Sequence, residues 1–202
     1  MKAGLDVFVF SDAEKLLITA AMVELRPWDS ESVAAIKQRI KNFHLRFAES
    51  MCCYCYRDLT AEFSFVIDVE HILPKRHYKP LTFDVRNLSV ACKRCNMKMK
   101  RDRLDFLDLP FDESELEAGE KYKIIHPNID YRDQHLKRVV LQFNAKRMVK
   151  YVPVGASAKG VFSYNYFQLA EFEIDSFDTA QGANQPIDEA IAAIRELVNS
   201  IN

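Results

Sequence analysis

Cys52-Cys53-Tyr54-Cys55 and Cys92-Lys93-Arg94-Cys95 enclose the stretch Asp68-Val69-Glu70-His71-Ile72-Leu73-Pro74-Lys75, around which the chain is organised. Each of the two flanking segments contains a C-x2-C pair. Such a pair places two thiolates on one tight turn, and two pairs commonly supply the four tetrahedral ligands of a zinc ion. Unrelated buried thiols or disulfides of a secreted protein are the alternatives, which the matched spacing disfavours. The pattern predicts a structural zinc site formed by Cys52, Cys55, Cys92 and Cys95, because using Cys53 would shorten the first pair to C-x-C.

The enclosed stretch, together with Asn96 directly after the second cysteine pair, contains the residue types that phosphodiester hydrolysis requires. That reaction needs a base to activate water and a divalent cation to neutralise charge on the phosphate. His71 can accept a proton near neutral pH, and Glu70 and Asn96 offer the hard oxygen ligands that Mg²⁺ or Mn²⁺ prefers. A lone histidine after a strand is more often structural than catalytic. The flanking cysteine pairs and Asn96 favour the catalytic interpretation here.

Residue types, order and spacing together resemble the HNH endonuclease family in its zinc-knuckle form. The matching motifs lie between residues 52 and 96 and read Cys52-x2-Cys55, Glu70-His71-Ile72-x-Pro74, Asn87-Leu88 and Cys92-x2-Cys95-Asn96. The resemblance implies a ββα-metal fold, in which a strand ends at the histidine and a later helix carries the last asparagine. It further implies that His71 is the general base, that Glu70 and Asn96 hold a catalytic Mg²⁺ or Mn²⁺, and that Asn87 fixes the loop that orients His71.

The strand before the histidine raises a geometric question. Strict alternation would send Glu70 and His71 to opposite faces, so both can reach one phosphate only if the strand ends or bends there, which Pro74 favours. Asp68 lies two residues before Glu70, so its side chain is expected on the same face of the strand. It is a further candidate metal ligand, and the alternative is that it is a solvated strand residue.

One position departs from the family pattern. The family has a lysine three residues after the final asparagine, whereas this chain has Met99 between Lys98 and Lys100. On an α-helix the change moves the positive charge by about 100° around the axis. This shift affects the phosphate contact expected from the family lysine. It does not affect the residues expected to bind the metal.

Positive charge is concentrated near these residues. Between His71 and Arg103 the chain has ten lysines and arginines against two aspartates, a net charge of +8, although the whole chain carries −1. Positive potential focused beside catalytic residues fits a polyanionic substrate such as DNA. The candidate nucleic-acid-binding residues are Lys75, Arg76, Lys79, Lys93, Arg94, Lys98, Lys100, Arg101 and Arg103.

The remaining patterns predict an α+β protein with a ββα-metal core, N-terminal helices and a C-terminal α/β extension. A capping box at 11–14 predicts a helix that stops at Pro27, and apolar spacing predicts a second helix over 29–49. Alternation over 63–69 predicts the strand that leads to His71, and 88–91 the short second strand. We expect a helical segment at 1–50, the nuclease core at 51–107, an acidic linker at 108–120 and the extension at 121–202.

The extension has three features whose roles stay open. Residues 138–152 read as a hairpin, 122–125 as a strand, and the aromatic residues of 162–167 as core or as a surface for unpaired bases. His126 and His135 could form a second polar site or be ordinary surface histidines. An apolar stripe after Pro186 predicts a C-terminal helix that packs on the body or pairs with another chain.

Composition excludes some classes of protein. The chain begins without the apolar run of a signal peptide and has no stretch near the roughly 18 apolar residues of a membrane span. With reduced, zinc-bound cysteines this predicts a cytoplasmic location. The five glycines form no phosphate-binding loop, so an ATP site within this chain is not expected.

The combined prediction is a metal-dependent HNH endonuclease acting on DNA. The Glu-His-Ile-x-Pro version of the motif is similar to HNH subunits of bacterial anti-phage or restriction-type systems. That resemblance implies a partner ATPase or sensor subunit. The alternative is a non-catalytic zinc ribbon that binds nucleic acid, or a subunit used for assembly.

Overall fold

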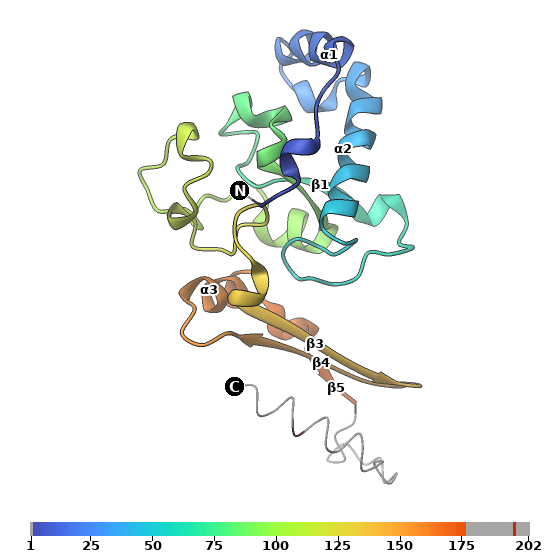
Figure 1. The fold of residues 1–202 in the computed structure, drawn as a ribbon, viewed down its shortest axis with the longest axis vertical. Helices are drawn as coiled ribbons and strands as arrows, with labels where there is room; N and C mark the ends of the chain where they lie inside the picture. Colours follow the sequence, from blue (N-terminus) through green and yellow to red (C-terminus); the bar gives the residue numbers. More distant parts are fainter. Residues whose placement is uncertain (1, 177–195, 197–202) are drawn as a thin grey trace. The chain divides into compact units, whose positions relative to one another are not determined.

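The computed structural model describes residues 2–176 and 196, and the chain divides into two compact units, 1–131 and 132–202 (Figure 1). Helices are mixed with two small antiparallel sheets, which confirms the predicted α+β class. The finer division into a helical segment, a nuclease core and a linker stays a prediction. Among the described residues, none of the helices is both long and apolar enough to span a bilayer.

The two N-terminal helices differ in how closely their first residues match the prediction. Helix α1, Asp12–Met22, starts with the predicted capping box: the Ser11 hydroxyl accepts from the Glu14 amide, and the Glu14 carboxylate accepts from the Ser11 amide. Helix α2, Ala34–Phe47, starts later than predicted. The short 3₁₀ helices η2, Pro27–Asp29, and η3, Glu31–Val33, occupy the residues before it.

One apolar cluster lies between α1, α2 and the loop that follows the first strand. Its buried members are Ala21, Val33, Ile36, Ile40, Phe83 and Leu88, and Trp28 packs against them while half-buried. Burying such a side chain stabilises the fold by about 1.5–3 kcal/mol. The cluster therefore fixes η2 and the loop beside the first sheet.

That sheet consists of β1, Ile67–His71, and β2, Leu88–Cys92, paired antiparallel with His71 opposite Leu88 and Ile67 opposite Cys92. The second strand was predicted correctly, but the prediction that the first starts at Phe63 is wrong. Residues 64–66 form a 3₁₀ turn, and the Phe63 and Phe65 side chains are 83% and 79% exposed. The ammonium of Lys41 fixes this turn by donating to main-chain oxygens of Ser64 and Ile67. The two phenylalanines therefore do not pack against an apolar surface, although their spacing is that of a strand.

The helix after β2 is a π-helix. It runs over Arg94–Lys100 and carries Asn96, as predicted for the helix of the ββα core. Cys95, Met99 and Lys100 are its buried residues. A π-helix bonds residue i to i+5 and so widens each turn by about one residue relative to an α-helix.

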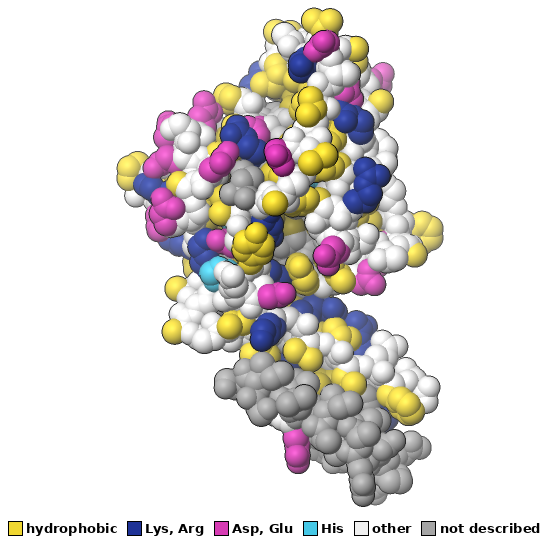
Figure 2. All heavy atoms as spheres, viewed as in Figure 1, with side chains coloured by type: hydrophobic (Ala, Val, Ile, Leu, Met, Phe, Trp, Pro, Cys, Tyr) yellow, Lys and Arg dark blue, Asp and Glu magenta, His cyan; other side chains and the backbone are white. Residues whose placement is uncertain are grey.

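The acidic segment 108–120 contains two short 3₁₀ helices, Glu113–Glu115 and Gly119–Lys121. Leu116 is buried, and its carbonyl accepts a hydrogen bond from the hydroxyl of Tyr122. Acidic side chains gather over this part of the surface (Figure 2). Glu117 pairs with Arg86 at 2.7 Å, which adds a polar tie to the unit formed by residues 1–131.

The second unit contains a sheet of order β3-β4-β5: Leu136–Phe143, Lys146–Pro153 and Ile174–Asp175. The first two strands confirm the predicted hairpin, with its turn at Asn144 and Ala145. Helix α3, Ala158–Tyr166, carries most of the aromatic cluster. The predicted strand at 122–125 is wrong, because Tyr122 makes only an isolated bridge with Leu107. The predicted C-terminal helix lies outside the described residues.

Candidate active site and zinc centre

The four predicted zinc ligands meet in one buried cluster. The sulfur atoms of Cys52, Cys55, Cys92 and Cys95 all lie within 4.8 Å of one another. A tetrahedral zinc site with Zn–S bonds of about 2.3 Å has sulfur–sulfur edges of about 3.8 Å. The Sγ atoms of Cys55 and Cys92 are 3.8 Å apart. Size, burial and donor set therefore suit a structural zinc ion.

The protonation of this cluster also favours a cation. The pKa of Cys92 is lowered because the Cys52, Cys55 and Cys95 thiols can donate to its sulfur, whereas the pKa of Cys95 is raised because the neighbouring sulfurs, Cys52 first, oppose its ionisation. Four thiolates can coexist here only with a positive ion among them. The Cys92 amide already donates to Cys52 Sγ at 3.3 Å, the kind of outer bond that orients a metal ligand. Cys53 stays outside the cluster.

His71 ends β1 and is held on two sides. Its Nε2 lies 3.0 Å from the carbonyl oxygen of Thr82, and its ring meets the ring of Trp28 edge-on with centroids 4.6 Å apart. A carbonyl can only accept, so Nε2 carries the proton and Nδ1 the lone pair. Nδ1 makes no hydrogen bond with the residues that the structure describes. Burial, reinforced by the charge of Lys75, lowers the pKa of His71 to about 3, which keeps the ring neutral at physiological pH.

Glu70 is buried in an ion pair. Its Oε1 lies 2.7 Å from the ammonium of Lys100 and accepts a hydrogen bond from the Tyr54 hydroxyl at 3.0 Å. Both charged side chains are only 1% exposed. Burial raises the pKa of Glu70, and the charge of Lys100 acts against that rise. The same ammonium donates to the main-chain oxygen of His71 at 2.7 Å.

The π-helix accounts for the displaced lysine. Lys100 lies four residues after Asn96 rather than three, and on an α-helix it would point about 100° away from the side chain at the third position. The wider turn of the π-helix brings Lys100 to the inner face, beside Glu70. Lys100 is therefore an interior residue, and it is not part of the positive surface that could meet a phosphate.

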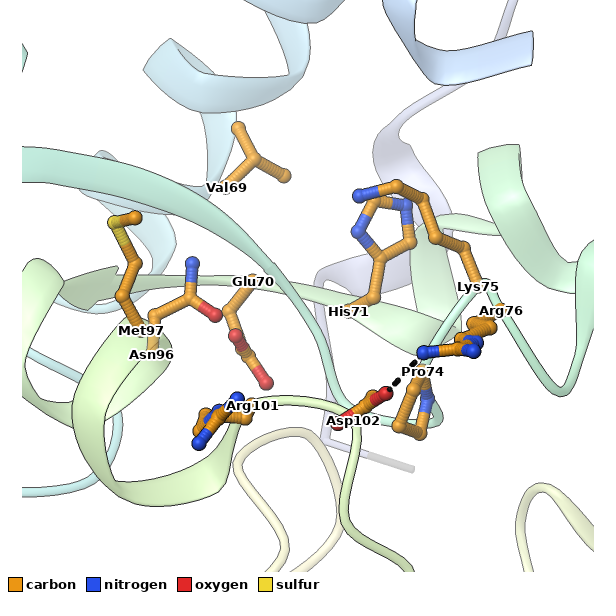
Figure 3. A pocket seen from close by; sticks show the side chains of 10 residues that line it. All are labelled: Val69, Glu70, His71, Pro74, Lys75, Arg76, Asn96, Met97, Arg101 and Asp102. Carbon is orange, nitrogen blue, oxygen red and sulfur yellow. Dashed lines mark hydrogen bonds and ion pairs between the residues drawn. The ribbon is translucent and has the colours of Figure 1, made fainter. Parts of the chain in front are cut away.

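Asn96 is oriented by Asp68. The Asn96 amide nitrogen donates to the Asp68 carboxylate at 3.0 Å, and the Lys93 ammonium lies 3.4 Å from the same carboxylate. A carboxylate accepts only, so the amide oxygen of Asn96 must point elsewhere. In Figure 3 it lies toward the side chain of Glu70. Asp68 therefore contacts Asn96 and Lys93 and orients the Asn96 amide.

Asn87 ties together the two ends of the loop between β1 and β2. Its amide nitrogen donates to the carbonyl oxygens of Leu73 and Leu81, at 3.0 and 3.2 Å, and its amide oxygen accepts from the Leu73 amide at 2.7 Å. The side chain is completely buried. The residue after Leu81 is Thr82, whose carbonyl holds His71, so Asn87 fixes the segment that orients the ring.

One cavity of about 440 Å³ is lined by three of the four predicted catalytic residues (Figure 3). Glu70 and His71 from the end of β1 and Asn96 from the π-helix all line it, whereas Asn87 and Asp68 do not. Because β1 ends at His71, the two neighbouring side chains can both reach this space. An ion pair of 3.0 Å between Arg76 and Asp102 closes part of its rim.

The predicted basic residues are divided among several environments. Lys75, Arg76 and Arg101 line the cavity. Lys93 contacts Asp68 and covers the ring of Phe65, and Arg103 pairs with Asp105. The Lys79 ammonium donates to the carbonyl of Glu24. Lys98 is exposed and Arg94 half-buried, and neither lines the cavity.

Three contacts of the site were missed by sequence reasoning: Trp28, Tyr54 and Thr82. Trp28 is the single tryptophan of the chain and follows a proline, which is a weak signal for a fixed aromatic residue. Tyr54 lies inside the first cysteine turn and so had to be near the metal. Thr82 contributes only a main-chain oxygen, which no residue pattern identifies.

The two histidines of the predicted second polar site each make a local hydrogen bond. His126 is buried, and its Nδ1 accepts from the Asn128 amide at 3.1 Å. His135 makes a hydrogen bond of 2.8 Å with the Ser157 hydroxyl, within the second unit. Each histidine thus has a local partner of its own.

Comparison with known proteins gives one informative relative. No protein-family model matches the chain. The protein named Septu protein PtuB, from Bacillus thuringiensis, is 28% identical over 137 residues, which cover 68% of this chain and 43% of the relative. This chain is a distant homologue of that protein and spans less than half of its length.

Proposed function

We propose that this chain is a metal-dependent endonuclease of the HNH type that hydrolyses DNA phosphodiester bonds. One observation carries the proposal. A neutral imidazole with a free lone pair, a carboxylate and an amide oxygen face one cavity, and cationic side chains stand around it. The three groups belong to His71, Glu70 and Asn96. A purely structural zinc knuckle has no need for this combination.

In this proposal His71 removes a proton from the attacking water through Nδ1. The bond from Nε2 to Thr82 keeps the ring in the required tautomer and orientation. In the free protein the pKa of His71 is low because burial, and to a lesser extent the charge of Lys75, opposes protonation of the ring. A bound phosphodiester would bring a negative charge beside Lys75 and so raise the pKa of His71 towards the range useful for a base.

The divalent cation would be held by Asn96 and Glu70. Both contacts that Glu70 makes with the described residues use Oε1, so Oε2 remains for the ion, together with the amide oxygen of Asn96. Few protein ligands are typical of Mg²⁺ or Mn²⁺ sites, in which water and substrate phosphate complete the shell. When bound, the ion would neutralise charge on the phosphate and the leaving oxygen. Asp68 then positions Asn96.

We further propose that the protein acts in a bacterial anti-phage or restriction-type system, in the cytoplasm, with a partner ATPase or sensor subunit. Two findings support this role. The motif resembles that of HNH subunits in such systems, and the chain is a distant homologue of a Septu protein. Because that relative is more than twice as long as the matched region, the partner and its mode of control are part of the proposal.

A second candidate function is a zinc-centred module that binds nucleic acid or assembles a complex without cutting. The ion pair between Glu70 and Lys100 favours it, since a buried carboxylate with its own counter-charge can have a structural role without binding a metal. The free lone pair of His71 beside that carboxylate argues against it.

A plasmid-cleavage assay separates the two candidates. We expect the wild type to cut in Mg²⁺ or Mn²⁺, and His71→Ala to lose at least 100-fold in rate, the usual contribution of a general base. His77→Ala, which removes an exposed histidine of the same loop, is the matched control and should keep its activity. Zinc content is measured for each protein. Equal cutting by His71→Ala and wild type would reject the assigned base, and an inactive wild type with its proposed partner present would reject the nuclease.

A further inference from the structure

A second cavity, of about 380 Å³, lies beside Trp28, whose ring contacts His71. Its lining includes Arg26, Pro27, Trp28, Lys75, Arg76 and Lys79. Trp28 contacts the His71 ring, and Thr82, whose carbonyl holds that ring, also lines the cavity. Lys75 and Arg76 line both cavities. The two spaces therefore share a cationic border.

The chemistry of this second cavity is that of a nucleotide site. It combines one indole ring with four cationic side chains, and its single acid, Asp29, is already paired with Arg26 at 2.6 Å. Aromatic rings offer stacking surface to any unpaired base, and neighbouring lysines and arginines neutralise the backbone. The volume lies within the range of about 300–1,000 Å³ that small-ligand pockets occupy.

Trp28 is held in place before any ligand arrives. Its carbonyl accepts from the Lys37 ammonium at 2.9 Å, and its ring packs against Phe83 with centroids 5.3 Å apart. The side chain is nevertheless only half-buried. A fixed and partly open aromatic ring loses little conformational entropy on binding, which makes it an effective recognition element.

We propose that this second cavity receives an unpaired nucleobase of the nucleotide next to the scissile phosphate. The inference rests on the proposed nuclease function and adds a substrate class to it. Because Lys75 and Arg76 border both cavities, one strand can place its phosphate beside His71 and the adjacent base beside Trp28. A base within a duplex cannot reach such a pocket without leaving the stack. The preferred substrate is therefore a single-stranded or locally unpaired strand.

Tryptophan fluorescence tests this directly, because Trp28 is the only tryptophan. The full-length, zinc-loaded protein is titrated without added Mg²⁺ or Mn²⁺, so that cutting does not interfere. The probes are hexadeoxyuridylate, hexauridylate, an abasic DNA hexamer of equal charge and a blunt DNA duplex. We expect saturable quenching by base-containing single strands, with affinity at least fivefold higher than for the abasic strand. The relative strength of the DNA and RNA hexamers identifies the sugar.

Variants check that the quenching arises in this cavity. Lys79→Glu reverses an exposed charge that lines only the second cavity, and it should weaken hexamer binding at least fivefold. Lys15→Glu makes the same change on α1, outside both cavities, and should bind as the wild type. Trp28→Phe keeps an aromatic ring and should retain affinity in fluorescence anisotropy with a labelled hexamer, whereas Trp28→Leu should lose at least fivefold. The melting temperatures of the last two show whether both are folded.

The outcomes distinguish this proposal from the nuclease proposal. Unchanged Trp28 fluorescence, or equal quenching by the abasic strand, would overturn the base subsite even if plasmid is cut. Base-dependent quenching that Lys79→Glu weakens would support the subsite even if no cutting is observed.

Discussion

The ammonium of Lys100 lies 2.7 Å from the carboxylate of Glu70 and 2.7 Å from the main-chain oxygen of His71. One buried cation thus joins the side chain of one predicted catalytic residue to the backbone of the next. It lies on the π-helix, so it also ties that helix to the end of β1. Loss of this cation should affect the fold and the site together.

We expect Lys100→Met to lower the free energy of unfolding by about 3–5 kcal/mol, because it leaves the buried Glu70 carboxylate without its counter-charge. Lys98→Met, an exposed position on the same helix, should change it by less than about 0.5 kcal/mol. Urea unfolding at pH 7 measures both. The double variant Lys100→Met with Glu70→Gln should recover part of the loss. Similar stability of the two single variants would show that the ion pair contributes little.

We expect substitution of a clustered cysteine to affect zinc binding and folding, and substitution of Cys53, outside the cluster, to affect neither. Cys92→Ser removes one of the four clustered sulfurs, and metal-coupled folding contributes on the order of 10 kcal/mol, so we expect loss of zinc and of the β1–β2 sheet. Cys53→Ser leaves the cluster complete and should retain one zinc ion per chain. Metal analysis and circular dichroism of the purified proteins provide the measurement. A folded, metal-free Cys92→Ser protein would contradict a structural role for the zinc.

His44 makes stability depend on pH. It is completely buried on α2, neither ring nitrogen has a hydrogen-bond partner in the described part of the chain, and burial lowers its pKa from 6.5 to about 4. The unfolded chain therefore binds more protons between pH 6.5 and 4, so stability is complete above 6.5 and falls as pH decreases through that window. Each pH unit in the window costs about 1.4 kcal/mol.

Replacing His44 with leucine removes that dependence. Between pH 6.5 and 4.5 the wild type should lose about 2 kcal/mol more than His44→Leu in urea unfolding. The variant keeps every zinc ligand, so the effect of acid on the thiolates is common to both proteins and cancels in the comparison. Parallel pH curves would mean that a buried partner, such as an ordered water, solvates the His44 ring.

The parts of this protein that sequence could predict are those with a local cause. Capping at Ser11, the paired cysteine turns and the hairpin around Asn144 each depend on residues a few positions apart. The misplaced start of β1 shows the limit of this reasoning. Phe63 and Phe65 have the right period, but they are exposed beside a 3₁₀ turn, which Lys41, over 20 residues earlier, holds by hydrogen bonds.

The same distinction holds within the candidate site. Motif spacing placed His71, Glu70 and Asn96 together, and they do line one cavity. The role of Lys100 was hidden because it depends on a π-helix, and nothing in the residue pattern separates that helix from an α-helix. Trp28 reaches His71 through tertiary packing alone, as do the main-chain atoms of Thr82.

The pKa of the His71 ring can be measured directly. Burial is the main cause of its low pKa, and the charge of Lys75 is the second. In the wild type, the imidazole signals of His71 in NMR spectra should keep their neutral positions as pH is lowered from 7.5 to 5. They are assigned by their loss in His71→Gln. Lys75→Ala removes the nearby positive charge, so the pKa should rise from about 3 towards 6.5, and the signals should begin to move at higher pH.

The charge-reversed variant sharpens the comparison. Lys75→Glu should raise the pKa of His71 further than Lys75→Ala, because it replaces a repelling charge with an attracting one. Arg103→Glu, outside the cavity lining, should leave the His71 titration where it is in the wild type. A His71 ring that titrates near 6.5 in the wild type would mean that it is open to water. That outcome would contradict the buried environment of His71, because burial is the main cause of its low pKa.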